Sequence, residues 1–261
     1  IGFVPTMGAL HMGHMSLLEC SIAENKITVC SIFVNPAQFN DPEDFKRYPL
    51  TIDEDLLKLK KAGCDIVYLP WIKDVYPKGI INVETFDLGG LDIKVEGDYR
   101  PGHFQGVAMA VDRLLQYVGP CKLYLGQKDI QQFQVIKYMI TNKLHKVEPV
   151  MCSTIRESNG LAMSSRNKHL GSKEKSQLGI IHDTLSWAAK NILNRSVKDI
   201  INDAKEKLLE CIYINDVEYF EILTLNDLEP VIKASKSEPL VICVALNTNK
   251  ARLIDNILLF Y

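Results

Sequence analysis

The residues best suited to chemistry lie at the start of the chain, where two histidines stand three positions apart. They belong to the segment Pro5-Thr6-Met7-Gly8-Ala9-Leu10-His11-Met12-Gly13-His14, between a short apolar run and a stretch with helical spacing. A strand, a glycine-punctuated turn and a helix aim backbone N–H groups at an anion, and the helix dipole adds partial positive charge. His11 and His14 place two imidazoles beside the same point. The segment therefore predicts a site for the phosphates of a nucleotide.

Two other interpretations of the histidine pair remain open. A His-x-x-His pair can bind zinc, but a catalytic zinc site needs a third protein ligand. The sequence contains no Cys-x-x-Cys, no His-Glu-x-x-His and no third clustered histidine, so we predict no metal site of the protein's own. The histidines could also be purely structural, because turns flanked by glycine often carry polar residues.

Two further clusters of polar residues follow predicted strands. Asn35 and Gln38 offer uncharged donors and acceptors that suit the hydroxyls or carboxylate of a small substrate, although a turn capped by asparagine explains them equally well. In the second cluster, Lys128 at a helix start can reach a phosphate, Asp129 can accept ribose hydroxyls, and Gln132 lies one turn further on. A solvated surface lysine is the alternative there.

A third cluster, Met163-Ser164-Ser165-Arg166-Asn167, lies in a polar connection. Two hydroxyls and a guanidinium could form a mobile clamp for an oxyanion, because arginine offers a fork of donors. A flexible serine-rich linker is the alternative. The loop Glu96–Phe104 is also unusually polar, and its charges could be structural.

The elements that position these clusters alternate between strand and helix. The predicted strands are Ile1–Val4, Ile27–Val34, Asp65–Leu69, Lys122–Leu125 and Val147–Ile155. The predicted helices are Gly13–Glu24, Asp53–Ala62, Phe104–Val118 and Ile130–Leu144. Alternation of this kind predicts an α/β domain, a Rossmann-like parallel sheet with helices on both faces. Ligands bind at the carboxyl ends of the strands in such sheets, and the polar clusters lie there.

The pattern changes near residue 154, where we place a domain boundary: residues 1–154 form the nucleotide-binding domain and residues 155–261 a smaller α+β domain. Helical stretches at Lys173–Leu193 and Val197–Leu209 precede strand-like runs at Glu218–Thr224, Leu240–Leu246 and Arg252–Phe260. Strands so close in sequence predict a small antiparallel sheet.

Composition restricts the class of protein further. The chain has 261 residues, 47% of them hydrophobic, and a net charge of −2, which argues against a nucleic-acid partner held by phosphate contacts. Its apolar runs are too short to span a bilayer, so we predict no membrane partner. Seven widely spaced cysteines are typical of buried thiols in a reducing cytoplasm. No signal peptide is visible, but the chain begins inside the first expected strand, so we expect a native segment before Ile1.

Five motifs in one order carry a resemblance to a known family. They are Pro5-Thr6-Met7-Gly8-Ala9-Leu10-His11-x-Gly13-His14, Phe33-Val34-Asn35-Pro36-x-Gln38-Phe39, Arg100-Pro101-Gly102-His103-Phe104, Gly126-x-Lys128-Asp129-x-Gln131-Gln132 and Met163-Ser164-Ser165-Arg166-Asn167. Together they resemble the pantothenate synthetase (pantoate–β-alanine ligase) family, over the whole chain as far as Ala251-Arg252-Leu253-Ile254-Asp255-Asn256. The wider group with the His-x-Gly-His turn includes nucleotidyltransferases and class I aminoacyl-tRNA synthetases.

The resemblance implies ATP-dependent joining of pantoate and β-alanine through a pantoyl adenylate, with release of AMP and pyrophosphate. It implies catalytic roles for His14, as acid or polarising group, and for His11 and Lys128. Gln38, Gln132 and Asn35 are the implied substrate-binding residues. The implied ATP-binding residues are Met7, Gly8, Ala9, Leu10, His11, Met12, Gly13, His14, Gly126, Gln127, Lys128, Asp129, Ile155 (through its backbone), Met163, Ser164, Ser165 and Arg166. Mg²⁺ is expected to arrive on the ATP phosphates, and the implied assembly is a homodimer.

One departure from the family pattern is Gln127, which stands where glutamate is usual. The amide keeps hydrogen bonding but removes a charge. Two rival functions remain: another small-molecule nucleotidyltransferase of the His-x-Gly-His group, and a nucleotide-binding module without catalysis. Formation of AMP that requires β-alanine distinguishes the ligase from both.

Overall fold

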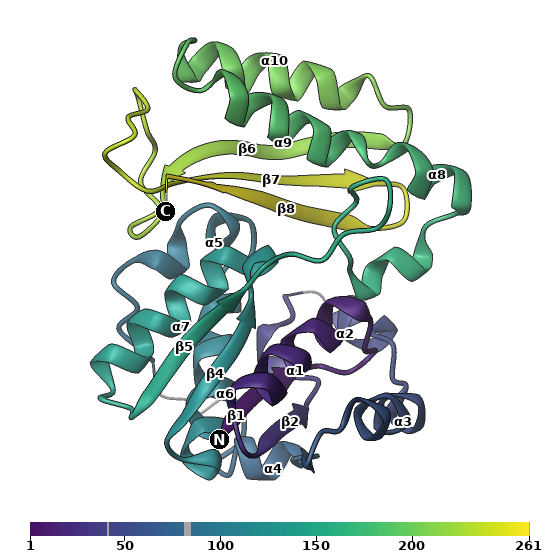
Figure 1. The fold of residues 1–261 in the computed structure, drawn as a ribbon, viewed down its shortest axis with the longest axis vertical. Coiled ribbons are helices and arrows are strands. Elements are labelled where there is room, and N and C mark those ends of the chain that lie inside the picture. The colour runs from purple at the N-terminus through teal and green to yellow at the C-terminus, as the bar shows by residue number, and fades with distance from the viewer. Residues whose placement is uncertain (41, 81–84, 261) are drawn as a thin grey trace. The chain divides into compact units, whose positions relative to one another are not determined.

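The computed structural model describes residues 1–40, 42–80 and 85–260. By its internal contacts the chain divides into two compact units, Ile1–Ser153 and Thr154–Tyr261. Each unit has its own sheet (Figure 1).

The first unit contains a parallel sheet of five strands in the order β3-β2-β1-β4-β5. Its strands are β1 (Gly2–Thr6), β2 (Thr28–Ile32), β3 (Ile66–Tyr68), β4 (Cys121–Gly126) and β5 (Val147–Cys152). Its α-helices are α1 (Met12–Glu24), α2 (Pro42–Arg47), α3 (Ile52–Ala62), α4 (Ile72–Val75), α5 (Glu96–Tyr99), α6 (His103–Val118) and α7 (Ile130–Asn142). Short 3-10 turns are η1 (Pro36–Gln38), η2 (Leu91–Ile93) and η3 (Gln127–Asp129). The predicted α/β architecture is confirmed.

The core of this unit follows from the alternation of side chains along the strands. Val4, Cys30 and Tyr124 point to one face, where they share a cluster with Leu18 of α1 and Leu59 of α3. Helix α1 thus packs against the centre of the sheet. Its amino end, which carries the two histidines, is thereby fixed at the carboxyl end of β1.

The second unit contains an antiparallel sheet in the order β6-β7-β8, as predicted. Its elements are η4 (Ser165–His169), α8 (Ser172–Gln177), α9 (Ile180–Asn191), α10 (Val197–Leu209), β6 (Ile214–Thr224), β7 (Leu240–Thr248) and β8 (Arg252–Leu259). Helices α9 and α10 cover one face of the sheet (Figure 1).

The single helix predicted over Lys173–Leu193 is wrong, because the structure divides it into α8 and α9 at Gly179. The backbone of Gly179 lies against the carbonyl oxygen of Asn159, so closely that a Cβ would overlap with it. Apolar spacing continues across the break, which is why periodicity alone did not reveal it.

Candidate active site

Three of the predicted clusters lie at carboxyl ends of neighbouring strands in the first unit. Met7–His14 follows β1, Asn35–Gln38 follows β2, and Gly126–Asp129 follows β4. Strand order reverses between β1 and β4, the place where open α/β sheets bind ligands. Hydrogen-bonded pairing between β1 and β4 is confined to Gly2 with Lys122 and Phe3 with Leu123. The two strands are therefore unpaired with each other where the clusters begin.

The two histidines form a reciprocal cap at the amino end of α1. Nδ1 of His11 accepts a hydrogen bond from the N–H of Gly13 at 3.1 Å, and Nδ1 of His14 accepts one from the N–H of His11 at 3.3 Å. The ring centroids are 4.1 Å apart. Because Nδ1 is an acceptor in both rings, the neutral form of each carries its proton on Nε2. In its neutral form, each ring therefore has its N–H donor at Nε2.

The environment keeps His14 neutral at physiological pH. Burial is the main cause that lowers its pKa from 6.5 to about 3, and the charges of His11, Lys128 and Lys58 act in the same direction. A neutral imidazole donates a hydrogen bond without carrying charge. The influence of Lys128 also means that the clusters after β1 and β4 lie within electrostatic range of each other.

The turn before the histidines differs from the predicted cradle of backbone N–H groups. The N–H of Gly8 donates to Oγ1 of Thr6 at 3.3 Å, and those of Ala9 and Leu10 donate to the carboxylate of Asp55 at 2.8 Å each. These three N–H groups already have acceptors within the protein. The side-chain donors of the histidines are therefore the better candidates for phosphate contacts.

Asn35 and Gln38, the substrate-binding residues predicted after β2, make different contacts from each other in the structure. Asn35 is 2% exposed, and its Nδ2 donates to Oε1 of Gln38 and to the carbonyl oxygen of Gly106. Its Oδ1 accepts from the N–H of Ala37 and from the hydroxyl of Tyr76. All its hydrogen-bonding capacity is used by the protein. In the structure Asn35 therefore holds the side chain of Gln38, and its role in substrate binding stays a prediction.

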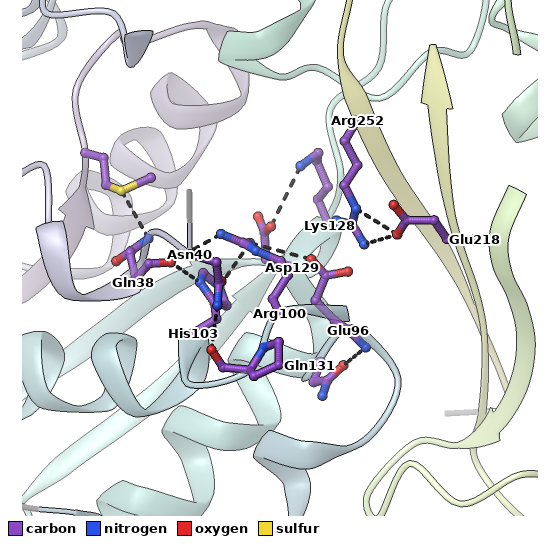
Figure 2. Close-up of polar contacts among 12 residues, drawn as sticks. Gln38, Asn40, Glu96, Arg100, His103, Lys128, Asp129, Gln131, Glu218 and Arg252 are labelled. Carbon is purple, nitrogen blue, oxygen red and sulfur yellow. Dashed lines mark hydrogen bonds and ion pairs between the residues drawn. The ribbon is translucent and has the colours of Figure 1, made fainter. Parts of the chain in front are cut away.

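Gln38 lies between this network and the opening turn. Its Nε2 is 3.1 Å from Sδ of Met7. Its backbone carbonyl accepts hydrogen bonds from Nδ1 of His103 at 2.7 Å and from the guanidinium of Arg100 at 3.3 Å (Figure 2). Arg100 in turn pairs with Glu96 at 3.5 Å. The polar loop that sequence analysis left without a role thus holds Gln38 in place.

In the cluster after β4, Lys128 is 20% exposed and its Nζ lies 3.8 Å from Oδ1 of Asp129 (Figure 2). Gln131 is buried and holds the loop before α5: its Oε1 accepts from the N–H of Glu96, and its Nε2 donates to two carbonyls of that loop. The side-chain amide of the adjacent Gln132 has no hydrogen-bond partner among the described residues, and the residue is half-buried. The structure thus separates a structural glutamine from one suited to a ligand.

The remaining predicted residues belong to the second unit. The carbonyl of Ile155 accepts from the N–H of Met163. Oγ of Ser164 accepts from the N–H of Arg166 at 3.2 Å, and Ser165 is buried. Arg156 forms a two-pronged ion pair with Asp255, at 2.6 and 2.9 Å. These contacts within the second unit give the segment a defined conformation there.

The low pKa values of two histidines give a pH prediction. Burial lowers the pKa of His103 to about 4, and that of His14 is about 3. Below a pH of about 6.5 the unfolded chain binds protons that the folded protein does not. We therefore expect the free energy of unfolding to fall as the pH decreases from about 6.5 towards 4. Chemical denaturation across that range measures it.

His103→Gln removes one of these titrating groups, so its stability should depend less steeply on pH than that of the wild type. His169→Gln is the control, because His169 is exposed. An identical slope for His103→Gln and the wild type would contradict the prediction.

Three further observations concern the described ranges 1–40, 42–80 and 85–260. No helix in them is long and apolar enough to cross a membrane. No three His, Cys, Asp or Glu side chains there form a group that could hold a metal ion. The seven cysteines all lie within these ranges, and no disulfide joins them.

The chain is similar to known proteins in sequence and in structure. A family model described as pantoate-beta-alanine ligase matches residues 1–258. Pantothenate synthetase from Cytophaga hutchinsonii is 42% identical over 99% of this chain and 91% of its own length. That from Flavobacterium psychrophilum is 40% identical, over 98% and 91%.

Solved structures are also similar. Pantothenate synthetase from Thermus thermophilus has a TM-score of 0.90 and 36% identity, covering 98% of this chain and 92% of that one. Pantoate-beta-alanine ligase from Francisella tularensis, complexed with beta-gamma ATP and beta-alanine, has a TM-score of 0.79 and 35% identity, covering 98% and 88%.

Proposed function

This chain belongs to the pantoate–β-alanine ligase family, and we propose that it forms pantothenate from pantoate and β-alanine through a pantoyl adenylate. A carboxylate is a poor acylating agent, so the pantoate carboxylate first attacks the α-phosphorus of ATP and pyrophosphate leaves. The amine of β-alanine then attacks the acyl carbon, the C–N bond forms, and AMP leaves. No nucleophilic side chain is needed for either step.

The observation that carries this proposal is the pair of imidazoles, of which His14 is neutral, within electrostatic range of Lys128. Transfer of a phosphoryl group depends on positioning and on stabilisation of charge at the phosphate oxygens. His11 and His14 each offer an Nε2–H donor, and Lys128 supplies positive charge within range of His14. With its pKa at about 3, His14 polarises a phosphate oxygen as a neutral donor instead of acting as a cationic acid.

The other predicted residues divide between the two substrates. Gln38 and Gln132 hold the hydroxyls and carboxylate of pantoate, and Asn35 orients Gln38. Residues Met7–Gly13 and Gly126–Gln127 line the nucleotide, with Asp129 on the ribose. Ile155 meets adenine through its backbone, and Met163–Arg166 bind phosphate oxygens. ATP brings Mg²⁺ on its phosphates, because this ion prefers substrate phosphates and water to an all-protein cage.

An assay with all three substrates tests the proposal. We expect AMP and pyrophosphate to form in equal amounts with pantothenate, and AMP to require both pantoate and β-alanine. Omission of β-alanine should leave a single turnover of enzyme-bound adenylate. A stable nucleotidyl product would instead indicate a nucleotidyltransferase, and ATP binding without any turnover would indicate a binding module.

Replacement of the two glutamines separates the substrate sites. Gln38→Ala and Gln132→Ala should weaken pantoate binding by about 1–3 kcal/mol, because substrate hydroxyls then lose their buried partners. ATP binding should stay unchanged, since neither amide belongs to the phosphate cluster. Calorimetric titration of both ligands measures this. Gln134→Ala, on the same helix, is the control. Equal losses of ATP and pantoate affinity would contradict the division.

The backbone of the segment Met163–Asn167 should exchange its amide hydrogens more slowly when the nucleotide binds. Adenylates hydrolyse readily, so a productive site must exclude water between the two half-reactions. Ser164, Ser165 and Arg166 can donate hydrogen bonds to phosphate oxygens once the nucleotide is present. We expect hydrogen exchange across residues 160–168 to slow on addition of ATP. Exchange that is already slow without ligand, and unchanged by ATP, would identify the segment as purely structural.

The family resemblance is also the basis for proposing a homodimer in the cytoplasm. Light scattering coupled to size-exclusion chromatography tests the first part, and cell fractionation tests the second. A monomer at the protein's working concentration would refute the dimer.

A further inference from the structure

A buried carboxylate on α3 supports the turn that carries the two histidines. Asp55 lies in the first turn of α3 and is 0% exposed. Its Oδ2 accepts from the N–H of Ala9 and its Oδ1 from the N–H of Leu10, both at 2.8 Å. Oδ2 also accepts from the hydroxyl of Thr51 at 3.1 Å. Both oxygens are thus committed to the protein.

The next turn of α3 also binds the backbone of Leu10, at its carbonyl group. Nζ of Lys58 donates to the carbonyl oxygen of Leu10 at 2.9 Å and lies 3.9 Å from Oδ1 of Asp55. Helix α3 therefore fixes both the N–H and the C=O of Leu10. Lys58 also places a positive charge beside the buried carboxylate, which offsets part of the cost of removing that carboxylate from water.

The turn needs such support because its backbone is unusual. Ala9 has φ = 49°, in the left-handed region that non-glycine residues rarely adopt. Gly8 has φ = 82°, and a Cβ at this position would lie 3.2 Å from Oδ2 of Asp55. A conformation of this kind persists only where its surroundings determine it. The hydrogen bonds that Ala9 and Leu10 donate to Asp55 hold the backbone in this conformation.

We propose that Asp55 is a positioning residue for adenylate formation. His11 directly follows Leu10, so the hold of Asp55 on Leu10 sets where α1 begins and where Nε2 of His11 and His14 point. Asp55 acts through the turn and does not touch substrate. This inference rests on the proposed function, because it assumes that the Nε2–H groups of His11 and His14 bind the phosphates of ATP.

Asp55→Asn tests the inference with little change in size. The amide has one acceptor oxygen, so one of the two backbone N–H groups of the turn loses its bond. A displacement of about 1 Å at reacting groups can slow a reaction by roughly a hundredfold. We expect single-turnover formation of pantoyl adenylate to slow by about ten- to a hundredfold, whereas the dissociation constant for pantoate changes by less than about twofold. Asp53→Asn, an exposed position in the same helical turn, should match the wild type.

The pantoate measurement distinguishes positioning from general loss of structure. A folded Asp55→Asn variant that forms adenylate at the wild-type rate overturns the inference. Equal losses of rate and pantoate affinity also overturn it, because they indicate general unfolding of the site. If Asp55→Asn does not fold, Thr51→Val decides, since it removes only the hydroxyl that holds Oδ2. Slower adenylation by a folded Thr51→Val supports the inference, and an unchanged rate overturns it. A wild type that forms no adenylate would refute the proposed function itself.

Discussion

Lys128→Ala is expected to slow formation of pantoyl adenylate by roughly a hundredfold or more, in line with loss of one stabilising donor at a developing oxyanion. Lys128 belongs to a short turn at the carboxyl end of β4 and lies within electrostatic range of His14. In the proposed reaction, positive charge at this place would stabilise the phosphate oxygens as pyrophosphate leaves. The side chain is only 20% exposed, so water screens its charge little. Rapid-quench measurement of AMP-bound pantoate under single-turnover conditions gives the rate.

Lys122→Ala is the matched control. Lys122 belongs to β4 itself, at the end of the strand opposite Lys128, and pairs with Glu24 at 2.9 Å. Its loss should leave adenylate formation unchanged. Near-normal adenylate formation by Lys128→Ala would show that Lys128 has no role in this step. A second variant, Lys128→Met, keeps most of the length without the charge, and we expect it to be as slow as the alanine variant.

His14→Ala is expected to have a comparable effect, whereas His14→Gln should keep part of the rate. The Nδ1 of His14 is committed to the N–H of His11, so the ring acts through its Nε2–H. The amide of glutamine can present an N–H at a similar place but cannot transfer a proton. Because His14 acts as a neutral donor, we expect glutamine to be faster than alanine by about tenfold, which corresponds to about 1.4 kcal/mol of transition-state stabilisation.

The pH dependence gives an independent check on His14. With a pKa of about 3, the ring stays neutral throughout the range in which the enzyme can be assayed, so the adenylation rate should show no ionisation of His14 near pH 6.5. Nitrogen-15 NMR of the imidazoles follows the titration directly. A glutamine variant as slow as the alanine variant, together with a titration near the ordinary pKa, would establish proton transfer instead.

Much of the architecture could be predicted because it depends on short-range patterns. Apolar residues at period two or period 3.6 bury one face of a strand or helix wherever the element is placed. The alternation of these periods predicted both sheets, and glycine-rich turns after strands marked Met7–His14 and Gly126–Asp129. Parallel strands bring their carboxyl ends to one edge. The sequence therefore predicted which clusters would meet without any knowledge of their contacts.

The tertiary structure decided how the residues in those clusters are used. Asp55 is 46 positions from Ala9, and His103 is 65 positions from Gln38. No local pattern distinguishes such partners from other polar residues on a helix, because acidic residues are favoured in the first turn of any helix. Likewise, only the contacts separate Gln131, which holds a loop, from its neighbour Gln132.

The tertiary structure also decided the charge of His14 and which backbone N–H groups are available to a ligand. Both histidines were evident from sequence, but the neutral state of His14 depends on burial and on lysines from two other elements. The glycines predicted open N–H groups, yet a distant carboxylate occupies those of Ala9 and Leu10. Sequence determines which groups a turn contains. Packing determines which of them remain available to a ligand, because a hydrogen bond made inside the protein uses the same donor that a phosphate would need.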